Sequence, residues 1–506
     1  MTGDQHKNGN GAGSVVLASR KGRWVLSASV LASGMALLDG TIVNIALPRL
    51  GRDLGATLDV LQWTVNAYML TLTGLILLGG GLGDRYGRRR VFLVGVVWFA
   101  LASALCGVAP NSEVLIAARA LQGVGGALLT PGSLALVQST FRQQDRAKAV
   151  GAWSGLGGVA GAIGPFLGGW LVDGPGWRWI FLINLPLAAA VVLVALRHVP
   201  ESRDPEATGD FDTLGATLAA LGLAGVTYAL IAASGHEPAT AVVVSAVLGL
   251  ACGALFVQVE RRRAHPMLPL GIFSVRLFSA VNVVTLFLYA AIGGVFFILP
   301  VQLQTAAGYS AFQAGVSTLP ITVLMLVLSA PAGALAQRVG PRLPLTLGPL
   351  ITAAGLVLLR RTGPDSTSYV ADVLPAVVIQ GLGMSLFVAP LTATVLASLD
   401  VSRSGIASGV NNAAARAAQL LIVAVLPLAV GLSAHDYTSP GAVDHAFGSA
   451  MLLCAALCVV SAALAWFLVP TSALEPTPDH EVAHPECHTN LGVSAPPLEP
   501  GEDTGR

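Results

Sequence analysis

The chain has 506 residues, of which 54% are hydrophobic and only 11% are charged, and its net charge is +1. Soluble domains usually carry about 25% charged residues, so a water-soluble protein of this size is excluded. The basic residues are spread over short loops, and no nucleic-acid partner is expected. The five cysteines show no CxxC pair or metal-ligand spacing, so we assign them no disulfide framework.

Apolar runs recur from Trp24 to Trp466 at about 20 residues each, the length that crosses a ~30 Å hydrocarbon core. The first run continues past the length of a signal-peptide core without a cleavage site, so we expect it to be retained. In chain order the runs predict an all-α membrane protein of about fourteen spans, at 24–47, 61–83, 91–109, 113–139, 151–172, 180–198, 213–233, 239–258, 278–302, 312–336, 343–360, 370–398, 411–433 and 446–469.

An internal repeat predicts two related halves. Gly80–Arg89 is echoed by Gly333–Arg342, and each lies between the second and third spans of a six-span unit. Parallel halves of this kind place a substrate site near the bilayer midplane, at their interface. The predicted division is an N-terminal tail (1–23), a six-helix half (24–198), a linker with two additional spans (199–275), a second six-helix half (276–469) and a C-terminal tail (470–506).

Lysine and arginine concentrate in the segments that are cytoplasmic when the N-terminus is inside. The positive-inside rule therefore predicts a multi-pass protein of the cytoplasmic membrane with both termini cytoplasmic. The Pro-rich, acidic tail after Pro470 is expected to be disordered. Its cluster of His480, His484, Cys487 and His488 could in principle ligate a metal, but we expect a polar tail without one.

Within the predicted spans Asp39 is the one deep acid, and Arg119 in the fourth span reaches a similar depth. An adjacent arginine favours the charged form of a carboxylate, whereas desolvation favours the neutral form. A conformational change that alters either effect can make Asp39 bind or release a proton, as a proton-driven carrier requires. The alternative is a static ion pair that only fixes helix packing, although buried pairs contribute little to stability alone.

Two glycine-containing motifs are further candidates. The loop containing Gly80, Asp84, Arg85, Gly87 and Arg88 can form a clasp at the cytoplasmic face that opens and closes as the halves move; the alternative is that its charges only orient the protein. In the fifth span Gly164, Pro165, Gly168 and Gly169 predict a kinked helix with small contact faces.

A mostly apolar substrate cavity with a few polar groups is expected between the halves. Ordinary helix packing is at least as good an explanation for each single candidate. The candidate lining residues are Asn44, Gln62, Trp63, Asn66, Tyr68, Gln122, Tyr289, Phe296 and Phe297.

Nucleotide-driven and enzymatic chemistry have no candidate residues. None of the three lysines follows a GxxxxG run, so a P-loop is absent. No GxSxG or HExxH motif is present, and the histidines fall in tails or loops. We therefore expect a non-enzymatic protein that uses no nucleotide, metal or cofactor.

These motifs resemble the major facilitator superfamily, and within it the fourteen-span drug:proton antiporters. Leu38–Pro48 resembles that group's first-helix signature, whose acid is implicated in proton coupling, and Leu115–Gly123 its fourth-helix arginine motif. Gly80–Arg90 resembles the inner-loop motif, Gly164–Gly169 the fifth-helix antiporter motif of exporters, and Trp177–Pro186 a hallmark of fourteen-span members.

The resemblance implies the major facilitator fold and export of small lipophilic drugs or antibiotics in exchange for protons, by a protein functional as a monomer in the lipid bilayer. Ala160 stands where the antiporter motif often has glycine, and Gln337 replaces the acid in the second-half loop. No second acid lies in a later span, so neutral or monovalent substrates are expected. The alternatives are a symporter or uniporter for a nutrient or metabolite, and a non-transporting membrane sensor.

Overall fold

The computed structural model describes residues 15–203, 212–234, 237–263, 266–364, 368–400, 403–433 and 436–474. In these ranges the chain is helical apart from one isolated β-bridge, between Val15 and Phe141. The α-helices are α1 (Arg20–Leu54), α2 (Leu58–Tyr86), α3 (Arg88–Gly107), α4 (Ser112–Thr140), α5 (Gln143–Asp173), α6 (Trp179–Leu182), α7 (Asn184–His198), α8 (Thr213–Ala232), α9 (Ala239–Arg262), α10 (Arg276–Val301), α11 (Ala311–Ser317), α12 (Leu319–Val339), α13 (Arg342–Leu359), α14 (Leu374–Ala397), α15 (Ser404–Val430) and α16 (Pro440–Leu468). Short 3-10 or π turns are η1 (Leu270–Ser274), η2 (Gln302–Ala306), η3 (Tyr369–Val373), η5 (Asp436–Thr438) and η6 (Thr471–Leu474).

Fourteen helical segments of the described ranges are long and apolar enough to cross a membrane. Four of them combine neighbouring elements: α6 with α7, α10 with η2, α11 with α12, and η3 with α14. The prediction of an all-α membrane protein with about fourteen spans is confirmed.

The helices extend beyond several predicted spans. The hydroxyl of Ser19 accepts a hydrogen bond from the Gly22 amide at 3.0 Å, so α1 begins at Arg20, three residues before the end of the predicted tail 1–23, and that tail stays a prediction. α1 continues to Leu54, where Gly55 adopts a positive φ of 59° and closes the last turn. At the start of the predicted tail 470–506, Thr471–Leu474 forms a short turn. The His/Cys cluster lies outside the described residues.

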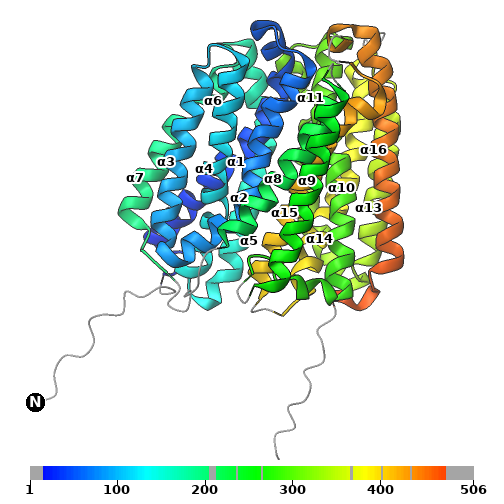
Figure 1. The fold of residues 1–506 in the computed structure, drawn as a ribbon. Coiled ribbons are helices and arrows are strands. Elements are labelled where there is room, and N and C mark those ends of the chain that lie inside the picture. Colours follow the sequence, from blue (N-terminus) through cyan, green and yellow to red (C-terminus); the bar gives the residue numbers. More distant parts are fainter. Residues whose placement is uncertain are drawn as a thin grey trace, which may run out of the picture.

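The first helix begins and the last helix ends at the same face of the molecule, the lower one in Figure 1. We call it the terminal face, and the opposite face the distal face. Helices α1–α7 lie on one side and α10–α16 on the other, and we call these groups the N-terminal and C-terminal halves (Figure 1). They meet where α1 packs on α10, α2 on α15, and α5 on α11 and α12.

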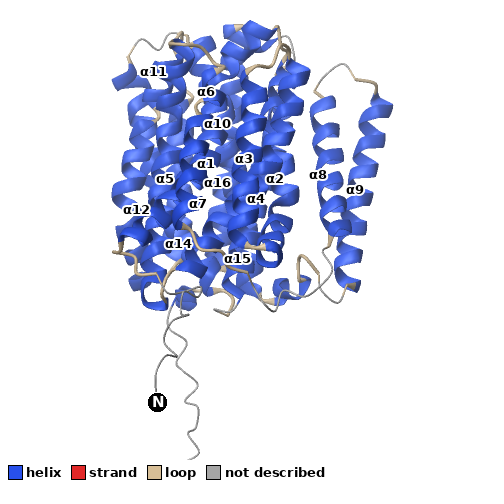
Figure 2. Ribbon diagram, turned by 90° about the vertical axis from the view of Figure 1, so that its left-hand side faces the viewer, coloured by secondary structure: helices blue, strands red, loops and turns tan. Residues whose placement is uncertain are grey.

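The two additional helices, α8 and α9, form a pair beside the halves (Figure 2). α8 contacts α2 and α15. In α9, by contrast, only 6% of the most apolar stretch is buried inside the protein. Gly225 and Gly249 allow the two helix backbones to approach closely, because a Cβ atom on either would overlap the other helix. The division into domains at residues 199 and 276 stays a prediction.

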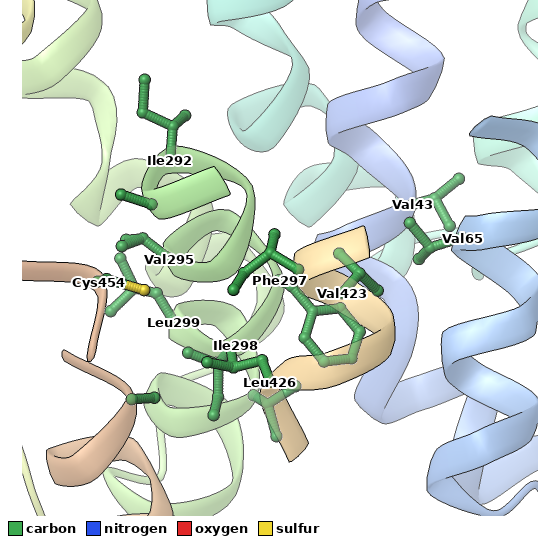
Figure 3. Close-up of a cluster of buried hydrophobic side chains, with 14 of the residues drawn as sticks. Val43, Val65, Ile292, Val295, Phe297, Ile298, Leu299, Val423, Leu426 and Cys454 are labelled. Carbon is green, nitrogen blue, oxygen red and sulfur yellow. The ribbon is translucent and has the colours of Figure 1, made fainter. Parts of the chain in front are cut away.

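Near the distal face, polar contacts join the two halves. Burial raises the pKa of Tyr437, so its hydroxyl remains a neutral donor there. Apolar side chains of both halves, including Val43, Phe297 and Val423, pack below these contacts (Figure 3). The halves are therefore closed toward the distal face. The bonds run from Gln62 to the Val423 carbonyl (2.7 Å), from Gln304 to the Ile45 carbonyl (2.9 Å), from Tyr437 to the Ala56 carbonyl (2.6 Å) and from the Phe312 amide to Asp173 (2.8 Å).

We expect Gly169→Ala to destabilise the closed distal face, since its Cβ atom would lie 2.6 Å from the Phe312 Cα atom. Overpacking of this kind costs about 1–3 kcal/mol. Thermal unfolding of the purified protein in detergent should show a lower melting temperature. The matched control is Gly155→Ala in the same helix, where a Cβ atom meets nothing within 4 Å. Equal melting temperatures for the two variants would refute this packing.

Candidate functional site

The structure brings Asp39 of α1 and Arg119 of α4 together inside the N-terminal half. Their side chains are 0% and 1% exposed, and Arg119 Nη1 donates to Asp39 Oδ2 at 2.5 Å. Asn111 caps α4 by accepting from the Val114 amide, which starts that helix two turns before Arg119. Because α1 extends to Leu54, Asp39 lies about 22 Å from the helix end at ~1.5 Å per residue.

A polar network completes the coordination of this pair. Gln122 donates to the second oxygen of Asp39, Oδ1, at 2.8 Å and to Ser103 Oγ at 3.2 Å. Its own Oε1 accepts from Arg119 Nη1 at 2.7 Å. Arg119 Nε donates to the Thr64 carbonyl at 3.0 Å. Both carboxylate oxygens of Asp39 thus have partners, and the charged form of Asp39 is well satisfied.

Aromatic rings enclose the guanidinium. The Arg119 Cζ atom lies 4.3 Å from the centroid of Tyr68 and 5.8 Å from that of Phe181. The Tyr68 hydroxyl donates to the Ala36 carbonyl at 3.2 Å, which fixes the ring against α1. A cation over an aromatic face is attracted by the ring quadrupole. The rings therefore hold Arg119 in place without adding a second negative charge.

The fifth-helix motif positions the part of α1 that carries Asp39. Gly164 and Gly168 lie against Thr41 and Ile42, so a Cβ atom on either would press into α1. Thr41 Oγ1 also donates to the Gly161 carbonyl of α5 at 3.2 Å. Two further motif residues face the C-terminal half: Gly169 lies against Phe312, and the Pro165 carbonyl against Gly315. One segment of α5 thus contacts both the Asp39 turn and the opposite half.

The inner-loop residues lie at the terminal face. Asp84 accepts from Arg88 Nε at 2.8 Å and pairs with its Nη2 at 2.7 Å, so this ion pair lies within the loop. Gly87 has a positive φ of 108° and packs against the Glu201 carboxylate. Glu201 also accepts from the Arg89 amide at 3.0 Å. The loop is thereby attached to the segment after α7. Gly80 makes only an ordinary contact with Pro131, and Arg85 lies 5.8 Å from the Tyr86 ring.

The predicted cavity residues divide by environment. Gln62 joins the halves, Gln122 and Tyr68 belong to the Asp39 network, and Phe297 packs in the apolar core (Figure 3). Trp63 faces Tyr228 of α8, with ring centroids 6.2 Å apart. Tyr289 and Phe296 pack at the edge of the core. Asn44 and Asn66 have buried amide atoms without hydrogen-bond partners among the described residues.

A surface pocket of about 360 Å³ lies toward the distal face, and none of the predicted cavity residues lines it. Its walls come from the C-terminal half, from the segment around α11 and from η3. It is lined by Tyr309, Phe312, Gln313, Val316, Ser317 and Tyr369.

Sequence reasoning missed three members of the polar network. Ser103 receives hydrogen bonds from Gln122 and from Asn184, the latter at 3.0 Å, and donates to the Phe181 carbonyl at 2.9 Å. Cys106 Sγ approaches Gln122 Oε1 at 3.7 Å. A serine or cysteine in an apolar run carries no charge signal, so only Asn184, inside the Trp177–Pro186 motif, could have been found from the sequence.

Sequence comparison matches residues 29–423, and again 281–494, to the Major Facilitator Superfamily. The chain belongs to this superfamily. It is therefore a non-enzymatic transporter with many membrane spans, and the family prediction is confirmed.

The relatives that it resembles are resistance and export proteins. It is 35% identical to the puromycin resistance protein pur8 of Streptomyces alboniger, over 88% of this chain and 91% of that protein. It is 34% identical to the tetracenomycin C resistance and export protein of Streptomyces glaucescens, over 84% and 79%. It is 34% identical to the multidrug efflux pump LfrA of Mycolicibacterium smegmatis, over 77% of each chain.

Solved structures share the fold. A bacterial homologue of the human lysosomal transporter Spinster matches with a TM-score of 0.62 and 16% identity, over 89% of this chain and 97% of that one. The peptide transporter PepTSo matches with a TM-score of 0.64 and 15% identity, over 88% and 97%. At such low identity these matches establish the major facilitator fold alone, which confirms the predicted fold class.

We expect Arg119→Met to destabilise the fold strongly, because it leaves the Asp39 carboxylate buried with Gln122 as its remaining side-chain donor. Breaking a buried pair from one side costs about 3–5 kcal/mol. The double variant Arg119→Met with Asp39→Asn should recover much of the loss in thermal unfolding. A double variant as unstable as Arg119→Met would show that the ion pair does not cause the effect.

We expect Glu201→Gln to loosen the inner loop, because the charged acceptor of the Arg89 amide is lost. Hydrogen–deuterium exchange should be faster in peptides covering 84–90 than in the wild type. Glu113→Gln, an exposed change at the start of α4, is the control and should leave these peptides unchanged. Unaltered exchange in Glu201→Gln would refute the attachment of the loop by this side chain.

Proposed function

We propose that this transporter exports small lipophilic drugs or antibiotics across the cytoplasmic membrane in exchange for protons. The observation that carries the proposal is the buried Asp39 carboxylate, held by Arg119 and Gln122 inside the N-terminal half. The resistance and export roles in the names of the relatives support a drug or antibiotic as the substrate. Transport would then require the lipid bilayer, the small solute and protons, and no cofactor. The monomer would be the functional unit.

Proton binding at Asp39 would act through α1. A neutral carboxyl loses the attraction of Arg119, so the two helices no longer hold each other as firmly. α1 also bears the Ile45 carbonyl, which accepts from Gln304 of the C-terminal half at 2.9 Å. A shift of α1 therefore reaches the contacts that close the distal face, and this links protonation to alternating access.

The positive-inside rule supports a cytoplasmic terminal face. Arg85, Arg88, Arg89 and Arg90 lie together in the inner loop on this side. With that orientation the closed distal face is the extracytoplasmic one, and the described conformation is ready to take up substrate from the cytoplasm. Asp84 would then latch this side in the alternate state, in place of its present pairing with Arg88.

We expect Asp39→Asn to abolish proton-driven export, because an amide cannot exchange the proton that the cycle needs. Efflux of a fluorescent substrate from vesicles under an imposed pH gradient should fall to the level of empty vesicles. Asp53→Asn, an isosteric change in the same helix at a residue paired only with Arg49 at the surface, should retain efflux.

Coupled efflux by Asp39→Asn equal to the wild type would defeat this proposal. Movement of the substrate across the membrane in the same direction as the protons would instead indicate a symporter. No flux of any compound would indicate a non-transporting sensor.

A further inference from the structure

A second cation lies in the membrane interior, at Arg416 of α15 in the C-terminal half. Its Nε atom is buried and has no hydrogen-bond partner among the described residues. Arg119 is paired with Asp39, whereas Arg416 forms no salt bridge within the described part of the chain. A charge inside a span costs at least about 2.5–3.5 kcal/mol on insertion scales. An unpaired arginine at such a position therefore indicates a binding role.

The packing of α15 places Arg416 at mid-height in the bundle. α15 begins at Ser404, so Arg416 lies about 18 Å along it at ~1.5 Å per residue. Asn411 donates to Thr285 of α10 at 2.7 Å, and Gln419 lies beside Gly293 of the same helix. Since both helices run in the same direction, Arg416 is level with the middle of α10.

Two tyrosines from different halves share this level. Tyr289 lies between Thr285 and Gly293 of α10, the residues that contact Asn411 and Gln419 of α15. Tyr68 lies six residues, about 9 Å, along α2 from Gln62, which donates to the Val423 carbonyl of α15. Tyr68 is also the ring that stacks on Arg119, at 4.3 Å. Arg416 is thus level with the Tyr68 ring of the Asp39 network, in the opposite half.

No acid of the network can neutralise Arg416. Asp39 is already bonded by Arg119 and Gln122. On α2, Asn66 lies one turn from Gln62, which contacts α15, and both amide atoms of Asn66 lack hydrogen-bond partners among the described residues. Toward the distal face, Phe297 and Val423 close the interface with apolar surface (Figure 3). This level of the interface therefore offers the cation of Arg416 and the unsatisfied amide of Asn66, with apolar side chains on the distal side.

We propose that Arg416 binds the anionic group, a sulfonate, carboxylate or phenolate, of an amphipathic aromatic substrate. Its body would pack under Phe297, and Asn66 would bind a further polar group. This inference rests on the proposed export function and names its substrate class. A guanidinium can donate two parallel hydrogen bonds to such an anion, which suits this task better than a lysine ammonium.

Binding by the purified full chain in lipid nanodiscs tests the proposal. The anionic probe is anilinonaphthalene sulfonate and the cationic probe is ethidium. Arg416→Gln should weaken sulfonate binding at least about tenfold, the size of one charge-assisted hydrogen bond, and leave ethidium binding unchanged. Arg416→Lys should bind the sulfonate with intermediate affinity. Arg403→Gln, an exposed arginine just before α15, is the control and should match the wild type.

Thermal unfolding separates a binding role from a structural one. Without probe, Arg416→Gln should be as stable as the wild type or more so, because it removes a cation whose buried Nε atom has no hydrogen-bond partner among the described residues. With the sulfonate, only the wild type should gain stability. A wild type that does not bind the sulfonate, a variant that binds it equally well, or equal loss of both probes would overturn the proposal.

The same preparation distinguishes failure of this inference from failure of the proposed function. Asp39→Asn should keep sulfonate binding, because Arg416 is intact, and lose only pH-driven efflux in vesicles. Normal efflux by Asp39→Asn would overturn the proposed coupling and leave Arg416 as an anion site. Normal sulfonate binding by Arg416→Gln would overturn the anion site and leave the coupling in place.

Discussion

The structure depends on one buried ion pair, between Asp39 and Arg119. Two charges in a low-dielectric interior are costly unless their hydrogen-bonding capacity is filled. Here Gln122 and the Thr64 carbonyl fill it, and the Tyr68 ring covers the guanidinium. The pair therefore joins α1, α2 and α4 in the charged state of Asp39. In the proposed mechanism, protonation of Asp39 would disrupt the pair and allow the N-terminal half to rearrange.

In the proposed mechanism, the glycines of α5 would transmit this change to the interface between the halves. α5 approaches the Asp39 turn through Gly164 and Gly168, and it approaches α11 through Gly169. A side chain at these positions would hold the helices apart, so a shift of α1 would be absorbed rather than passed on. Near the distal face, Gln304 donates to the Ile45 carbonyl of α1, and Gln62 of α2 donates to the Val423 carbonyl of α15. A shift of α1 would act on the first bond directly and on the second through the neighbouring helix α2. The proposed coupling site and the contacts that close the distal face therefore lie on neighbouring helices.

The sequence was sufficient for the spans and for placing Asp39 and Arg119 at a similar depth, because hydrophobic runs and rare charges are strong signals in a membrane protein. The sequence could not identify the side chains that form hydrogen bonds with the motif residues. Glu201 carries an ordinary loop charge, yet it secures Gly87 and Arg89. Ser103 is indistinguishable by pattern from any serine in an apolar run, although it connects Gln122 to Asn184. The boundary at Arg20 also needed structure, since the cap of Ser19 lies outside the apolar run.

The central claim is that the Asp39 carboxyl gains and loses a proton as the transporter changes conformation. Infrared difference spectroscopy on carboxyl-labelled protein, between substrate-bound and substrate-free states, observes this directly. The account predicts a protonated-carboxyl band in one state that is absent from Asp39→Asn but present in Asp53→Asn. A wild-type spectrum without such a band, or a band unchanged in Asp39→Asn, would contradict it.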